Sequence, residues 1–271
     1  MRPCSRGSRG RWPETAERKI SVVVFVCNWS VHPDEIREEF EPADSARART
    51  VQVKCTGRVD PVVVMEAFLE GHDGVLLLGC EPGNCHFVEG NLQAKEKVRT
   101  IKRLMDLADL RPERLEIRWC STVNEGQYTE TVHEFSGSIS EMGPSPLSGE
   151  SPDPVLRENM LSARDVLEDY RIRAVAGKAL ELTEKGNVYG ERVSKDEFGA
   201  FEGEAVETEY LRHRIRRLLR TPMTVPELSE KLDLDTRIVF RQVVALSGKG
   251  LVRLDRFEGK LPLYVAEEVQ S

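Results

Sequence analysis

Cysteine is the residue type in this chain whose placement points most clearly to chemistry. Four of the six cysteines come just after short apolar segments, and a fifth lies in a loop rich in glycine and proline: Cys27, Cys55, Cys80, Cys120 and, in the loop, Cys85. A single buried cysteine is commonly just a small apolar side chain. Five that fall near strand ends instead indicate a shared site for a metal or a metal cluster, because thiolates are soft ligands.

The spacing of these cysteines bears on what they bind. Zinc sites usually take their ligands from two closely spaced pairs. Here only Cys80 and Cys85 are close in sequence, with four residues between them. The same gap occurs in plant-type 2Fe–2S ligation. Spacing therefore favours an iron–sulfur cluster, with zinc as the alternative. Cys120 stands outside any glycine loop, so for it the buried apolar role is preferred.

Short segments that precede the cysteines are predicted to be strands, at residues 20–26, 50–54, 74–78 and 115–119. The first is a continuous apolar, β-branched run, which is typical of a strand buried on both faces of a parallel sheet. Helices are predicted at residues 33–40, 61–70, 92–110 and 127–142. This alternation predicts an α/β fold with a small doubly wound parallel sheet of the flavodoxin-like kind. Because parallel strands end at one edge, the sheet would gather the cysteines there.

Composition divides the chain further. We expect a flexible basic arm with Cys4, an iron–sulfur α/β domain, a linker rich in proline and glycine, a helical connector and a carboxy-terminal domain, at residues 1–19, 20–142, 143–154, 155–204 and 205–271. Within the connector, residues 155–184 are predicted to be helical and residues 186–203 to be a glycine-rich connection. The last segment has three helices and two strands, with a capping box from Thr224 to Glu227, and resembles a winged helix.

Charge and hydropathy exclude several classes of protein. The 271 residues carry a net charge of −7, and 39% of them are hydrophobic. No segment approaches the roughly 18 consecutive apolar residues of a membrane helix, and the basic start lacks the apolar run of a secretory signal. Cysteines are too sparse for a disulfide scaffold. These features predict a cytoplasmic protein without a membrane partner, and its acidic bulk disfavours nucleic acid.

Three blocks of sequence resemble a known family. They are V-V-F-V-C-N-W-S at residues 23–30, K-C-T-G-R-V-D-P at 54–61 and G-C-E-P-G-N-C-H-F-V-E-G-N at 79–91. These blocks resemble the delta subunit of methyl-viologen-reducing hydrogenase, over about residues 20–142. In that family the first block is C-N-W-C, so Ser30 stands where a second cysteine is usual. The winged-helix segment lies outside the resemblance.

The resemblance implies a function and a site. It implies a non-catalytic subunit of an oxidoreductase complex that carries one 2Fe–2S cluster on the four matched cysteines, Cys27, Cys55, Cys80 and Cys85. Such subunits relay electrons from a hydrogenase, a formate dehydrogenase or a similar redox module to the flavin subunit of heterodisulfide reductase or its relatives. Those two modules are therefore the expected partners.

Two other functions remain open from the sequence. The cluster or metal could control a DNA-binding winged helix, because arginines line residues 212–220 and Arg237 and Arg241 lie on the expected recognition helix. Alternatively, Cys85 beside His86 could be a reactive thiolate. Asn91 is predicted to cap the helix that follows the cysteine loop.

Overall fold

The computed structural model describes residues 18–43 and 45–267. The predicted basic arm and Cys4 lie outside this part of the chain, apart from Arg18 and Lys19. A five-stranded sheet has the order β2-β3-β1-β4-β5. Its strands are β1 (Ile20–Cys27), β2 (Glu39–Ala43), β3 (Ala46–Val53), β4 (Gly74–Cys80) and β5 (Leu115–Cys120). All neighbours pair in parallel except β2, which is antiparallel to β3 at the edge.

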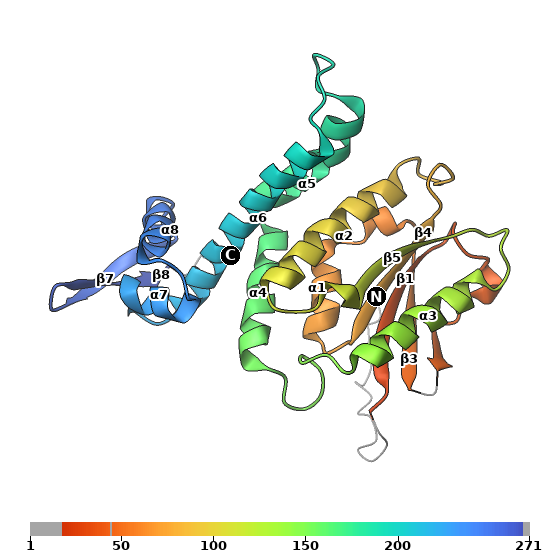
Figure 1. Cartoon of the computed structure of the whole chain (residues 1–271), viewed down its shortest axis with the longest axis horizontal. Helices are drawn as coiled ribbons and strands as arrows, with labels where there is room; N and C mark the ends of the chain where they lie inside the picture. The colour runs from red at the N-terminus through yellow and green to blue at the C-terminus, as the bar shows by residue number, and fades with distance from the viewer. Residues whose placement is uncertain (1–17, 44, 268–271) are drawn as a thin grey trace, which may run out of the picture.

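Helices cover both faces of this sheet (Figure 1). They are α1 (Pro61–Leu69), α2 (Gly90–Leu107) and α3 (Gln127–Met142). Alternate residues of β1 enter two different cores: Val23 and Phe25 pack with α1 and α2, whereas Val22 and Val24 pack with α3. Burial on both faces explains the continuous apolar run of this strand. The predicted α/β class is confirmed.

The helix predicted at residues 33–40 is wrong. Only a short 3-10 turn forms there, at Pro33–Glu35, and β2 follows it. The alternating sequence E-F-E-P-A pairs with β3 at the sheet edge, where Pro42 is tolerated because an edge strand needs fewer backbone donors. Phe40 packs against the core under α3, which holds this strand in place.

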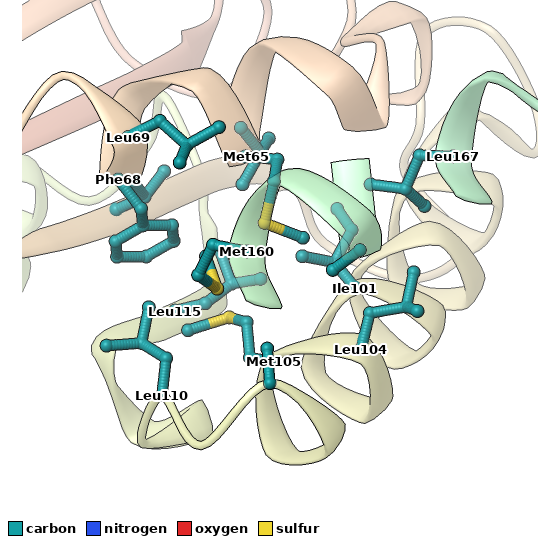
Figure 2. Packing of buried hydrophobic residues seen from close by; sticks show 14 of the residues in the cluster. Met65, Phe68, Leu69, Ile101, Leu104, Met105, Leu110, Leu115, Met160 and Leu167 are labelled. Carbon is teal, nitrogen blue, oxygen red and sulfur yellow. The ribbon is translucent and has the colours of Figure 1, made fainter. Parts of the chain in front are cut away.

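A further layer of helices covers α1 and α2. It consists of α4 (Pro154–Glu168), α5 (Tyr170–Leu180), a π-helical turn at Glu181–Lys185 and the long α6 (Lys195–Leu218). Figure 2 shows side chains from α1, α2 and α4 pointing toward one another, with Met160 of α4 among Met65, Ile101 and Met105. Residues beyond 154 therefore contribute to the same apolar core as the sheet.

The glycine-rich connection predicted at residues 186–203 is wrong from residue 195 onward. A capping box between Ser194 and Glu197 starts α6. A Cβ on Gly203 would meet the guanidinium at the flexible end of the Arg103 side chain of α2. Here glycine lies inside a helix and does not mark a loop.

The last elements form a separate core. They are β6 (Met223–Thr224), α7 (Val225–Leu232), α8 (Thr236–Gly248), β7 (Val252–Glu258) and β8 (Leu261–Ala266), with a sheet order β6-β8-β7 (Figure 1). The predicted capping box from Thr224 to Glu227 is confirmed. The end of α6 packs into this core through Ile215 and Leu219. Among the residues described, no helix is both long and apolar enough to span a membrane.

Candidate metal centre

Two of the predicted site cysteines meet at the carboxyl ends of paired strands. Cys27 ends β1 and Cys80 ends β4, and these strands are hydrogen-bonded neighbours. Their Sγ atoms are 3.7 Å apart, and both side chains are buried. The parallel sheet thus joins two thiols that are 53 residues apart in the sequence.

The other two cysteines lie on loops beside this pair. Cys55 precedes a 3-10 turn at Thr56–Arg58 that follows β3, and Cys85 lies between β4 and α2. Both sulfurs face the first residue of α2: a Cβ on Gly90 would overlap Cys55 Sγ and would lie 3.5 Å from Cys85 Sγ. Only glycine permits this approach, so Gly90 forms one wall of a cradle for the two sulfurs.

The four sulfurs are arranged as two pairs. Cys27 lies beside Cys80, and Cys55 lies beside Cys85, with electrostatic interactions between the pairs. No three of these sulfurs all lie within 4.8 Å of one another. Among the described residues, one group of three possible metal ligands has its ligand atoms within 4.8 Å of one another: Asp169, Glu209 and His213. This group is far from the cysteines in sequence, and its Glu209 already forms ion pairs with Arg171 and Arg212.

Burial governs the charge state of these thiols. It raises the pKa of Cys27 to about 12 and also raises the pKa of Cys55. The backbone N–H groups of Trp29 and Gly57 donate to these two sulfurs and oppose the effect. Without a metal, both groups are therefore neutral at pH 7, and a bound metal would have to displace their protons.

Aromatic rings line the rim of the site. The rings of Trp29 and His86 are stacked, with centroids 3.6 Å apart and planes at 9°, and His86 meets Phe87 edge to face. Trp29 is 51% exposed and Phe87 is 46% exposed. Within the described residues, His86 makes no hydrogen bond to Cys85, so the arrangement does not favour His86 as the base for a reactive Cys85 thiolate.

Comparison with known proteins identifies the family. The model of methyl-viologen-reducing hydrogenase, delta subunit, matches residues 22–143. The iron–sulfur subunit of an F420-non-reducing hydrogenase from Archaeoglobus profundus is 31% identical over 133 residues, which cover 47% of this chain and 94% of that protein. This chain belongs to the methyl-viologen-reducing hydrogenase delta subunit family. The vhu iron–sulfur subunit of an F420-non-reducing hydrogenase from Methanococcus maripaludis is 35% identical over 102 residues, covering 38% of this chain and 76% of the relative.

The delta-subunit sequence also occurs within a larger protein. One subunit of a ferredoxin/F420H2-dependent CoB-CoM heterodisulfide reductase from Methanosarcina acetivorans is 32% identical over 124 residues, which cover 45% of this chain. The match spans only 16% of that relative's length. The family model ends at residue 143, so α4 to β8 lie beyond the part that is shared with the delta subunits.

Ser30 departs from the usual delta-subunit pattern, and the structure shows what it does. Its side chain is fully buried, and its hydroxyl lies 2.9 Å from the carbonyl oxygen of Cys27 and 3.3 Å from that of Leu78. The hydroxyl proton is donated to the backbone. Ser30 therefore fastens the loop after β1 to β4.

The side chain of Cys120 does not belong to the group of four matched cysteines. It is buried in the core beneath α3, and its thiol lies 3.9 Å from the Thr131 hydroxyl. Burial raises its pKa to about 11. Cys120 ends β5 in register with Cys80, at the same edge of the sheet, but its side chain lies in the core and agrees with the buried apolar role that was preferred for it. It packs as a small apolar residue.

Two residues that support the site were missed or assigned another role from sequence. Asn91 does not cap α2, whose N-cap is Glu89; its side-chain amide donates to the carbonyl oxygens of Cys80 and Glu81. Lys97 donates to the carbonyl oxygens of Gly57 and Val59 in the loop after Cys55. From the sequence, helical spacing places Lys97 one or two turns beyond the cysteine loop. It does not show that Lys97 donates to the carbonyl groups of Gly57 and Val59.

Replacing Asn91 by alanine should destabilise the chain by about 1–3 kcal/mol, because two carbonyl groups near Cys80 lose their buried donor. Urea unfolding of metal-free protein measures this. Asn124→Ala is the control, because Asn124 lies in an exposed loop, and a change within about 0.5 kcal/mol is expected there. Equal midpoints and slopes for Asn91→Ala and the unaltered chain would show that the tether contributes nothing.

Proposed function

We propose that this chain is an electron-transfer subunit that holds one 2Fe–2S cluster on Cys27, Cys55, Cys80 and Cys85. The observation that carries the proposal is the arrangement of four thiols in two pairs at the carboxyl edge of the sheet. A bound 2Fe–2S cluster supplies one-electron transfer, and each of its two irons takes two protein ligands.

The pairing supports a binuclear centre over a single zinc ion. Zinc with four thiolates is tetrahedral at about 2.3 Å from each sulfur, which would require all four sulfurs to lie about 3.8 Å apart. No three of them meet even 4.8 Å, whereas the Cys27–Cys80 pair meets 3.7 Å. Two pairs of sulfurs suit a centre with two metal atoms, in which each metal atom takes one pair.

The chain's own residues give this site the surroundings of an electron carrier. Burial of Cys27, Cys55 and Cys80 excludes water from most of the sulfur ligands. The backbone N–H groups of Trp29 and Gly57 point at sulfur, and such hydrogen bonds tune the reduction potential of a cluster. On the rim, Trp29, Phe87 and Val88 expose apolar surface on which a partner protein could dock close to the sulfurs.

The relatives support the kind of complex. Several are iron–sulfur subunits of hydrogenases, and one heterodisulfide reductase subunit contains a matching segment within its own chain. We propose that the chain relays electrons between a hydrogenase, formate dehydrogenase or similar redox module and the flavin subunit of a heterodisulfide reductase-like complex. We also propose that the first domain is flavodoxin-like and that the last is a winged helix, with the domain boundaries predicted from the sequence. A cytoplasmic location is a further part of the proposal.

The alternative is a redox-sensing regulator that binds DNA through its carboxy-terminal elements. The arginines before α7 weaken it, because several are already paired within the chain. Arg212 contacts Glu209 and Gln242, and Arg217 contacts Asp165 and Glu158. The exposed face of α8 adds Ile238, Phe240 and Val244 to its arginines. This mixture suits contact with protein better than contact with phosphate.

Metal analysis tests the proposed centre. Protein purified without oxygen should contain about two iron and two sulfide ions per chain and should show the electron paramagnetic resonance signal of a 2Fe–2S cluster after reduction by dithionite. An iron chelator applied under denaturing conditions should remove the iron and the visible absorbance together. Stoichiometric zinc, with neither sulfide nor a resonance signal, would refute the cluster.

A further inference from the structure

A cavity lies next to the loop that carries Cys55. It has a volume of about 200 Å³, and its walls come from that loop, the start of α1, the middle of α2, the end of α4 and α5. The walls formed by α4 and α5 lie beyond residues 22–143, the segment shared with the delta subunits. The cavity is therefore closed by a part of this chain that the shared segment does not contain. Nothing in the proposed electron-transfer function accounts for it.

Positive charge dominates the polar part of this cavity. Four ionisable residues line it: Arg58, Asp60, Lys97 and Arg173. Arg173 binds Asp60 through both guanidinium N–H groups, at 2.9 and 3.1 Å, so these two charges offset each other. Among the described residues, Arg58 and Lys97 have no carboxylate partner within 4.0 Å, and Lys97 donates only to neutral carbonyl groups. The ionisable residues that line the cavity, three cations and one carboxylate, therefore carry a net positive charge.

The remaining walls are mostly apolar. Leu167 and Ile172 are each only 3% exposed, and Ala176 adds a methyl group from the next turn of α5. A cavity with cations on one side and apolar side chains on the other is complementary to an organic anion. Its volume of about 200 Å³ is below the roughly 300–1,000 Å³ of pockets for drug-sized ligands, so the cavity suits a smaller molecule.

We propose that this cavity binds a small organic anion, with a carboxylate or phosphate head group between Arg58 and Lys97 and an apolar body against Leu167 and Ile172. The ligand touches the cysteine loop on one side and α5 on the other. Lys97 already holds the carbonyl groups on both sides of Arg58, so the head group binds to a loop that is fixed in place.

Calorimetric titration of the full chain tests this site with four probes in a buffer of low ionic strength. Benzoate and phenyl phosphate combine a charge with an apolar ring; benzamide lacks the charge, and inorganic phosphate lacks the ring. We expect saturable binding of benzoate or phenyl phosphate at one site per chain, and comparison of these two probes identifies the preferred head group. Equal binding of benzamide, or of inorganic phosphate alone, would overturn the proposed chemistry, as would no binding of either ring anion.

Two variants locate the binding. Arg58→Gln should weaken it by about 10-fold to 100-fold, because a charge-assisted hydrogen bond is lost. Arg111→Gln, at an exposed arginine that does not line the cavity, should leave it unchanged. Ala176→Leu should fill the cavity and abolish binding while the circular dichroism spectrum is retained, since leucine is also a good helix former. Unchanged affinity in Arg58→Gln and Ala176→Leu would place any binding elsewhere.

Discussion

Cys27→Ala is expected to reduce iron to a small fraction of the roughly two atoms per chain proposed here. Removing this thiol leaves Cys80 without the sulfur that lies 3.7 Å from it, so one iron would have a single protein ligand. The loss of affinity should exceed the approximately 100-fold that replacement of an outer partner of a metal ligand can cause. Iron and sulfide assays, with the resonance signal of the reduced protein, measure it.

Cys120→Ala provides the matched control, because it removes the same atom from another buried cysteine. Cys120 contacts Thr131 in the core under α3, so its replacement should lower stability modestly and leave iron, sulfide and the signal intact. If Cys120→Ala lost iron to the same extent as Cys27→Ala, the ligand set would be wrong. Full iron content in Cys27→Ala would also contradict the proposal.

Gly90→Ala is expected to disturb the site through one methyl group. The added Cβ would overlap Cys55 Sγ and crowd Cys85 Sγ, so the start of α2 and the loop after β3 must separate. We expect most of the iron to be lost and the free energy of unfolding of the metal-free protein to fall by about 1–3 kcal/mol, as in other overpacked cores. Iron assay and urea unfolding measure the two effects separately.

Gly137→Ala adds the same methyl group where there is space. Gly137 lies within α3, and a Cβ there would meet no atom within 4 Å. This variant should keep its iron and gain about 0.5–1 kcal/mol in stability, because alanine favours a helix more than glycine does. A Gly90→Ala protein that behaved like Gly137→Ala would show that the two loops can separate without cost, and the cradle would then have no role.

The parts of the fold predictable from sequence are those governed by strong local patterns. The β-branched run that ends at Cys27 needs apolar neighbours on both faces, which only a central parallel strand provides. Such strands have a common direction, and this placed Cys27 and Cys80 at one edge. Cys120 also ends a parallel strand, but its side chain packs in the core under α3. The position of a residue at a strand end does not specify the direction of its side chain.

The remaining features depend on contacts between distant residues. The strand at residues 39–43 forms because β3 offers an open edge, and α6 continues through its glycines because Val206 and Tyr210 pack in the core with residues of α2. The stacking of Trp29 on His86, and the hydrogen bonds from Lys97 to the Cys55 loop, join segments that are tens of residues apart. Local propensity carries no information about such partners.

The helix α6 has a mechanical consequence. It spans 24 residues, or about 36 Å at 1.5 Å per residue, and it is continuous from Lys195 to Leu218. Val206 and Tyr210 belong to the core beside the sheet, whereas Ile215 belongs to the carboxy-terminal core. Because one rigid helix packs in both cores, a load applied to α8 by a bound protein would reach α2, the helix whose first residue lies against Cys55.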